Sequence, residues 1–144
     1  MKHLSGKDKK QLKELIPKGY ELDKKDEIII NEEDKIILKN KEPYLILKDE
    51  KYIPHLKSVN ESFYPKIFID NGAIPFLLKG ADMMRPGIEK IEGDFEKGEM
   101  VLIKNQNYPK VIGVGIAELN KAEMQNQQKG KSIKILHYIK DSFY

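Results

Sequence analysis

Short apolar runs separated by polar turns fill the first sixty residues. Apolar positions lie at helical spacing within residues 5–16, after Ser5 as a candidate N-cap, and they predict an amphipathic helix there. The polar side of this helix carries Lys7, Lys9, Lys10 and Lys13. Such a basic side indicates either a solvated face or a contact surface for RNA or a partner protein.

Three apolar runs then predict an antiparallel meander, with strands at residues 27–31, 35–39 and 43–48. A second short helix that carries His55 is expected over residues 54–59, and a linker over residues 60–65. The predicted domain formed by residues 1–62 is therefore a small α/β meander.

The most informative stretch runs from Ile67 to Ile88. Its pattern predicts a short strand, a glycine turn, one short helix and a second strand that is entered through Gly80. Asp70 or Asn71 is expected to cap the helix. A helix start that follows Gly72 would offer backbone N–H groups and a positive dipole end to a phosphate.

The remaining pattern favours β-structure. It predicts strands at residues 99–104, 110–119 and 131–139, a loop at 91–94 and a helical turn within 120–128. Gly113 and Gly115 are two positions apart, so both leave the same face of their strand free for close packing. The second predicted domain, residues 63–144, is thus mainly a β-barrel-like structure.

Composition narrows the class of protein. The chain has 144 residues, a net charge of +3, mixed charges at 34% and no cysteine. Disulfides and thiolate metal sites are thereby excluded. Because no apolar run resembles a signal peptide or approaches membrane length, we expect a soluble cytoplasmic protein with no membrane contact.

Four motifs occur in the order that is typical of a PUA domain, an RNA-binding fold. They are Asp70–Ile74 with Gly80–Ile88, then Asp94–Val101, then Val111–Ala117, and finally Lys129–Lys131 with His137 and Tyr138. The whole chain resembles the malignant T-cell amplified sequence family and its small archaeal relatives. The resemblance implies an α+β protein in which a PUA-like β pseudo-barrel follows a small N-terminal domain.

The resemblance also implies an RNA surface along the first helix, the following strand and the last strand of the PUA domain. Matched by motif, the candidate RNA-binding residues are Gly72, Ala73, Lys79, Arg85, Pro86, Gly87, Lys131 and His137. Arg85 is the only arginine in the chain, and a guanidinium binds phosphate bidentately or stacks on a base. A surface ion pair is the alternative interpretation of Arg85.

No constellation for catalysis stands out in the sequence. His3, His55 and His137 lie in different predicted elements, and no phosphate loop is present. Asp70 is better explained as a helix cap, and Asp82 as a turn or edge residue. Phe76–Leu78 and Met83–Met84 are interpreted as core. We therefore expect no enzyme activity, no bound metal and no cofactor.

The resemblance implies binding of tRNA or of the small ribosomal subunit in translation initiation, reinitiation or recycling. Eukaryotic family members work with the density-regulated protein, which carries a SUI-type domain, and a partner of this kind is an expectation here. Two alternatives stay open. The chain could deliver tRNA to a separate RNA-modification enzyme, or it could be a protein–protein adaptor that uses its N-terminal sheet.

Overall fold

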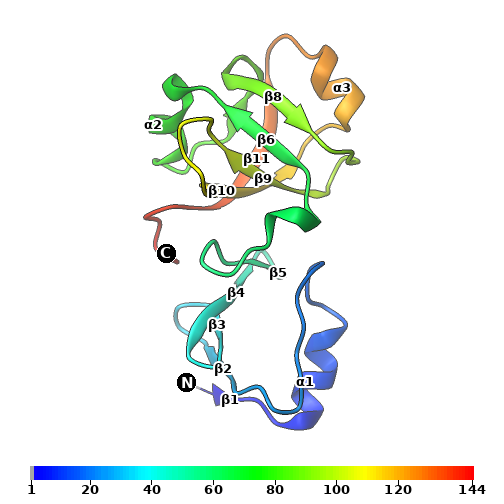
Figure 1. Cartoon of the computed structure of the whole chain (residues 1–144), viewed down its shortest axis with the longest axis vertical. Helices are drawn as coiled ribbons and strands as arrows, with labels where there is room; N and C mark the ends of the chain where they lie inside the picture. Colours follow the sequence, from blue (N-terminus) through cyan, green and yellow to red (C-terminus); the bar gives the residue numbers. More distant parts are fainter. Residues whose placement is uncertain (1) are drawn as a thin grey trace. The chain divides into compact units, whose positions relative to one another are not determined.

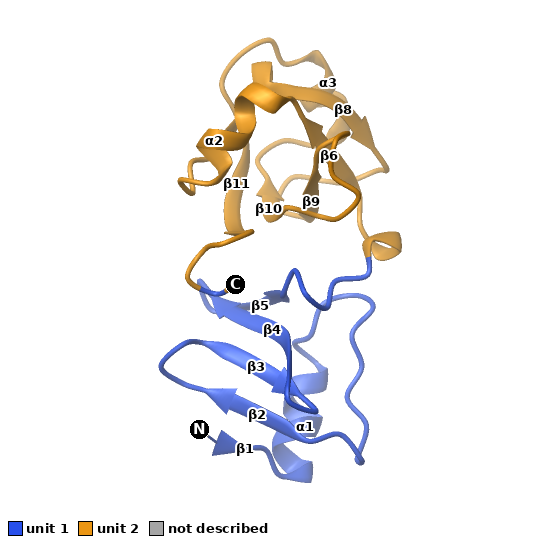
Figure 2. Cartoon of the chain, turned by 60° about the vertical axis from the view of Figure 1, so that its left-hand side comes forward, with its two compact units in different colours: residues 1–60, 143 blue, residues 61–142, 144 orange. Residues whose placement is uncertain are grey.

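The computed structural model describes residues 2–144 and consists of two compact units. Residues 2–60 with Phe143 form unit 1, and residues 61–142 with Tyr144 form unit 2 (Figure 2). Each unit has its own sheet and its own buried hydrophobic cluster. The α+β class predicted from the sequence is confirmed.

Unit 1 is an antiparallel sheet with strand order β1-β2-β3-β4-β5 and one helix (Figure 1). Its elements are β1 (Lys2–His3), α1 (Gly6–Lys13), β2 (Ile28–Asn31), β3 (Ile36–Lys39), β4 (Glu42–Lys48) and β5 (Lys51–Pro54). Ser5 caps α1 in a capping box with Asp8, as the sequence pattern predicts. Leu12 of α1 packs with Ile28, Ile37 and Leu45 of the sheet, so one face of the meander covers the helix.

The helix predicted over residues 54–59 is wrong, and a strand occupies its start. β5 pairs with β4 through a tight turn at Asp49 and Glu50, which both have positive φ. Pro54 ends this edge strand, where its missing N–H is tolerated. His55 follows in a turn and is buried, and its Nδ1 accepts a hydrogen bond from the Lys57 amide at 3.0 Å.

Unit 2 is a curled six-stranded sheet with strand order β7-β11-β10-β9-β6-β8. The strands are β6 (Lys66–Ile69), β7 (Met83–Met84), β8 (Ile88–Glu92), β9 (Met100–Lys104), β10 (Gly113–Ala117) and β11 (Lys131–Tyr138). The helical segments are η1 (Glu61–Phe63), η2 (Asn71–Ala73), α2 (Ile74–Leu77), η3 (Arg85–Gly87) and α3 (Lys121–Asn126). The β6–β9 pair is parallel and the other pairs are antiparallel.

The single strand predicted after Gly80 is instead two strands with a 3₁₀ turn between them. β7 pairs with β11, whereas β8 pairs with β6 and continues to Glu92, so the loop predicted at 91–94 is also partly wrong. Ile91 lies opposite Ile67 in this pair, and Ile67 is completely buried. Packing of Ile91 against β6 therefore extends β8 into the segment that the sequence pattern predicts as a loop.

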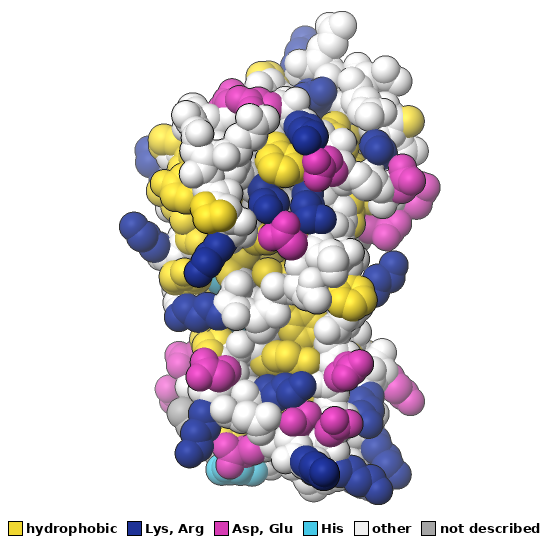
Figure 3. Space-filling model, viewed as in Figure 1, with side chains coloured by type: hydrophobic (Ala, Val, Ile, Leu, Met, Phe, Trp, Pro, Cys, Tyr) yellow, Lys and Arg dark blue, Asp and Glu magenta, His cyan; other side chains and the backbone are white. Residues whose placement is uncertain are grey.

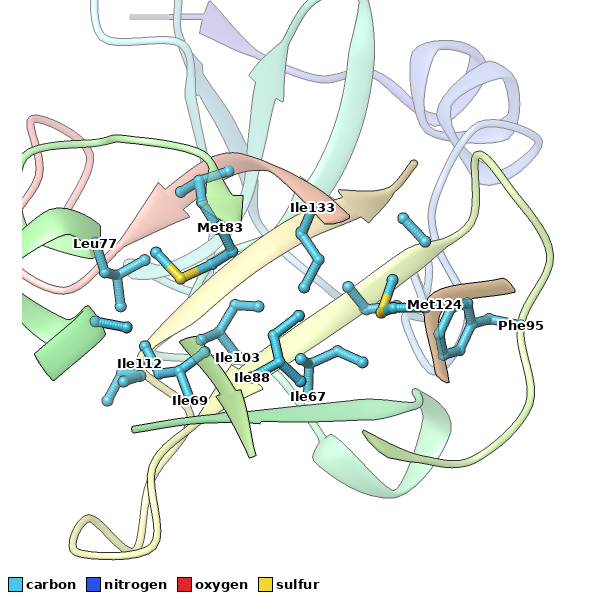
Figure 4. Close-up of a cluster of buried hydrophobic side chains, with 14 residues drawn as sticks. Ile67, Ile69, Leu77, Met83, Ile88, Phe95, Ile103, Ile112, Met124 and Ile133 are labelled. Carbon is cyan, nitrogen blue, oxygen red and sulfur yellow. The ribbon is translucent and has the colours of Figure 1, made fainter. Parts of the chain in front are cut away.

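The curled sheet closes around a hydrophobic core (Figure 4). Side chains from β6, α2, β7, β8, β9 and α3 meet there, among them Ile67, Leu77, Met83 and Met124. Gly113 and Gly115 of β10 both face members of this cluster. A Cβ atom at Gly115 would lie 2.5 Å from the Ile133 side chain of β11, next to a shift in the register of the β10–β11 pair.

Candidate nucleic-acid interface

The segment between β6 and β8 folds around the Asp70 carboxylate. Asp70 caps η2, and its Oδ1 accepts a hydrogen bond from the Ala73 amide at 2.8 Å, as the sequence predicts for a capping residue. α2 continues for four residues with Pro75 in its first turn, and Gly80 ends the segment with φ at 76°. One of the backbone N–H groups at this helix start, that of Ala73, is therefore already bound to a carboxylate.

Asparagines that the sequence analysis missed hold this turn in place. The buried Asn105 donates from Nδ2 to the carbonyl of Ile69 at 2.8 Å and to Asn71 Oδ1 at 3.1 Å. Asn107 donates to the same Asn71 oxygen at 2.9 Å. The loop after β9 thus fixes the start of η2, although no sequence pattern links positions 36 residues apart.

A groove of about 520 Å³ lies between the η2–α2 segment, β7 and η3. Its lining residues are Asp70, Gly72, Ala73, Phe76, Ala81, Asp82, Met83, Met84, Pro86 and Gly87, and we call this surface the Phe76 groove. Four of the predicted RNA-binding residues line it, namely Gly72, Ala73, Pro86 and Gly87. Gly87 permits the close approach of η3 to η2, since a Cβ there would lie 3.0 Å from the Ala73 Cβ.

Two large apolar side chains stand exposed at this groove. Phe76 is 59% exposed and Met84 is 51% exposed, whereas their neighbours Leu77 and Met83 are buried. The interpretation of the whole Phe76–Leu78 and Met83–Met84 segments as core was therefore wrong for Phe76, Leu78 and Met84. Alternation along β7 could have predicted that Met83 is buried and Met84 exposed, because successive residues of a strand point to opposite faces.

Arg85 lies beside the groove and binds backbone carbonyl groups. Its Nε donates to the Met124 carbonyl of α3 at 2.7 Å, and its Nη1 donates to the Ile88 carbonyl at 3.0 Å. The guanidinium therefore ties η3 to α3 and β8. The sequence predicts a phosphate contact or a surface ion pair for Arg85, and neither describes these two hydrogen bonds. Arg85 therefore has a structural role.

Arg85→Ala is expected to lower the free energy of unfolding by about 1–3 kcal/mol, because two carbonyl groups lose a charged donor. Urea denaturation measures the effect. Lys79→Ala is the matched control, since Lys79 is exposed at the end of the same segment and should change stability by less than about 0.5 kcal/mol. Equal stability of Arg85→Ala and wild type would contradict the structural role.

Lys131 lies in β11, opposite Met84 of β7, and is held by two carboxylates. Its Nζ lies 3.0 Å from Asp82 Oδ2 and 3.3 Å from Glu118 Oε1. Hydrogen bonds to Asp82 and then to Glu118 raise the pKa of the Lys131 ammonium. Asp82 also accepts from the Ile135 amide at 3.0 Å, which agrees with its predicted place at a strand edge. The Lys131 ammonium thus stays charged and is paired with two carboxylates.

His137 does not belong to the surface. Its side chain is completely buried in β11, and Nδ1 lies 2.8 Å from Asp141 Oδ2. A side chain in this position cannot touch RNA without a rearrangement of β11, so its predicted place in an RNA-binding surface is corrected. Its neighbour Leu136 is buried as well, so burial does not alternate at this end of β11.

Within residues 2–144, no three His, Asp or Glu side chains are grouped closely enough to hold a metal ion. In the same range, none of the helices is long and apolar enough to cross a membrane. The Phe76 groove has a largely apolar surface, which suits the face of a planar ligand such as a base.

Comparison with known proteins gives matches in both halves of the chain. The model of the PUA domain matches residues 65–139, and a model described as a domain of unknown function (DUF1947) matches residues 2–62. An uncharacterized protein of Methanocaldococcus jannaschii is 40% identical over 98% of this chain and 93% of its own length. Translation machinery-associated protein 20 of Saccharomyces cerevisiae is 32% identical over 91% of this chain and 75% of its own length.

A solved structure covers nearly the whole chain as well. The crystal structure of a hypothetical protein from Pyrococcus horikoshii is similar with a TM-score of 0.76 and 27% identity. The similarity covers 97% of this chain and 95% of that chain. The similarity therefore includes the fold of both halves and is not restricted to the curled sheet.

Proposed function

This chain belongs to the PUA domain family, and we propose that it is a non-catalytic RNA-binding protein of translation. Its similarity to translation machinery-associated protein 20 and to a malignant T-cell-amplified sequence 1 homolog of Dictyostelium discoideum supports the proposal. In this proposal residues 63–144 form the RNA-binding domain and residues 1–62 a separate domain. The RNA is tRNA, the RNA of the small ribosomal subunit, or both.

The Phe76 groove is the observation that supports RNA binding most directly. Exposed aromatic side chains bind single-stranded RNA because every base has a face that can stack on them. Phe76 and Met84 supply apolar surface of this kind at the edge of a groove that is large enough for a base. In this proposal the RNA backbone approaches the protein backbone closely at Gly72, whereas Gly87 serves the packing of η3 against η2.

Lys79 is proposed to contact a phosphate next to the groove. It is exposed at the end of the α2 segment, and no ion pair engages it among the residues that the structure describes. Arg85 contributes mainly by holding η3 against α3 and β8, which keeps Pro86 and Gly87 at the groove. Lys131 is a weaker candidate, since it would have to leave two carboxylates to bind a phosphate.

The proposed place of action is the small ribosomal subunit during initiation, reinitiation or recycling, with a SUI-type domain protein as partner. The names of the translation machinery-associated relatives support this assignment. The alternative is delivery of tRNA to a modification enzyme, because PUA domains also occur in tRNA pseudouridine synthases.

Affinity purification of the tagged chain from cells, followed by sedimentation and mass spectrometry, is the test. We expect the chain to travel with small ribosomal subunits and to lose them after ribonuclease treatment. The Phe76→Ala and Met84→Ala double variant should associate less, and Phe63→Ala, an exposed phenylalanine outside the groove, should behave as wild type. Recovery of a modification enzyme would favour the alternative, and recovery of neither RNA nor ribosomal protein would contradict the proposal.

A further inference from the structure

A second hollow, of about 530 Å³, lies wholly within unit 1. Five lysines line it, and we call it the lysine groove: Lys7, Lys9, Lys10, Lys13 and Lys24. The space-filling view shows basic side chains gathered over the part of the molecule where α1 lies (Figure 3). The lysine groove shares no residue with the Phe76 groove, whose lining belongs to unit 2.

The lysine groove has two walls that are fixed to each other. Lys7, Lys10 and Lys13 recur every three residues along α1, so they follow one side of the helix. Lys24 comes from the loop between α1 and β2. Lys9 joins the two walls, since its Nζ donates to the Lys24 carbonyl at 3.4 Å and also to the Asp26 carbonyl.

The charge of the lysine groove is not compensated. Lysines elsewhere form ion pairs, such as Lys104 with Glu61 at 2.8 Å and Lys39 with Asp26 at 3.5 Å. Between residues 2 and 144, none of the five groove lysines forms an ion pair with a carboxylate. Asp23 is the only acidic residue in the lining. Concentrated positive charge of this kind attracts a polyanion.

The lining favours a phosphate backbone over a protein partner. Protein interfaces are centred on aromatic or other large apolar anchors. The only large apolar residue in this lining, Leu22, is 2% exposed and belongs to the core of unit 1. Ammonium groups on flexible stems bind phosphates as point charges, without sequence preference.

We propose that the lysine groove binds the sugar–phosphate backbone of RNA and so gives the N-terminal domain a function of its own. The proposal rests on the proposed RNA binding of the chain and adds a second contact to it. This contact is electrostatic and independent of sequence, whereas the Phe76 groove binds bases. Its loss should therefore reduce the salt dependence of binding, which a stacking contact affects little.

The test is a titration of a fluorescently labelled tRNA transcript with the full chain at several salt concentrations. The variant combines Lys7→Gln, Lys10→Gln and Lys13→Gln, and glutamine keeps a helix propensity close to that of lysine. The control combines Lys41→Gln, Lys51→Gln and Lys97→Gln, three exposed lysines outside both grooves. Both variants have the same net charge, and circular dichroism compares their folding with that of wild type.

We expect the groove variant to lose about two to three units from the slope of log K against log salt, and on the order of tenfold in affinity at low salt. The control should lose less than one unit. Equal slopes for the two variants would overturn the proposal. The proposal would also be overturned if the groove variant lost binding to poly-L-glutamate and kept its binding to tRNA, because the groove would then suit an acidic protein partner. Failure of wild type itself to bind tRNA would overturn the proposed function first.

Discussion

Phe76→Ala combined with Met84→Ala is expected to lower the affinity for tRNA by about tenfold or more. Loss of one base-stacking contact costs about 1–3 kcal/mol, and 1.4 kcal/mol corresponds to a factor of ten. Because stacking is not an ionic contact, the salt dependence of binding should change little. Both side chains are about half exposed, so the free energy of unfolding should stay within about 0.5 kcal/mol of wild type.

Fluorescence anisotropy with labelled tRNA measures this effect, and urea denaturation checks the fold. Phe63→Ala is the matched control, because Phe63 is 49% exposed in η1 and does not line the Phe76 groove. If the control and the double variant bind equally well, bases do not stack in this groove. A double variant that loses salt dependence as well as affinity would indicate an ionic contact in place of stacking.

Gly115→Ala is expected to lower the free energy of unfolding by about 2–3 kcal/mol. Its new Cβ would lie 2.5 Å from the Ile133 Cγ2 and 2.7 Å from the Lys134 carbonyl oxygen. The oxygen belongs to the backbone of β11, which is paired with β10 and cannot move without loss of that pairing. Overpacking in a close-packed core costs about 1–3 kcal/mol.

Gly72→Ala is the control in the same unit. A Cβ there would meet only Asp70 Oδ1, at the ordinary contact distance of 3.4 Å, and the backbone is not left-handed. Urea denaturation should therefore give wild-type stability for Gly72→Ala and a clear loss for Gly115→Ala. Two equally stable variants would show that β10 and β11 are not packed as closely as the structure has them.

Local patterns predicted much of the fold. The capping boxes and glycine terminators are set by neighbouring residues, which is why Ser5 and Gly80 were interpreted correctly. The failures have two causes. β5 forms a hairpin with β4 across the tight turn at Asp49 and Glu50, and this turn was not predicted from the sequence. β8 extends to Glu92 because β6, which is distant in the sequence, lies beside it.

The candidate site, too, was predicted only in part from the sequence. Motif positions predicted that Gly72, Ala73, Pro86 and Gly87 come together, and they line one groove. Motif position does not reveal what a side chain binds, so Arg85 and Lys131 were not predicted to have internal partners. His137 was placed on the surface, although its hydrogen bond to Asp141 forms inside the unit.

Photo-crosslinking of tRNA that contains 4-thiouridine, followed by mass spectrometry of the peptides, tests the central claim most directly. The account predicts crosslinks to the peptides of the Phe76 groove, which carry Phe76 and Met84, and their loss in the Phe76→Ala and Met84→Ala double variant. Weaker crosslinks to α1 are expected from the lysine groove. Efficient crosslinks that avoid residues 70–87 altogether would contradict the account, because RNA would then be bound by another surface.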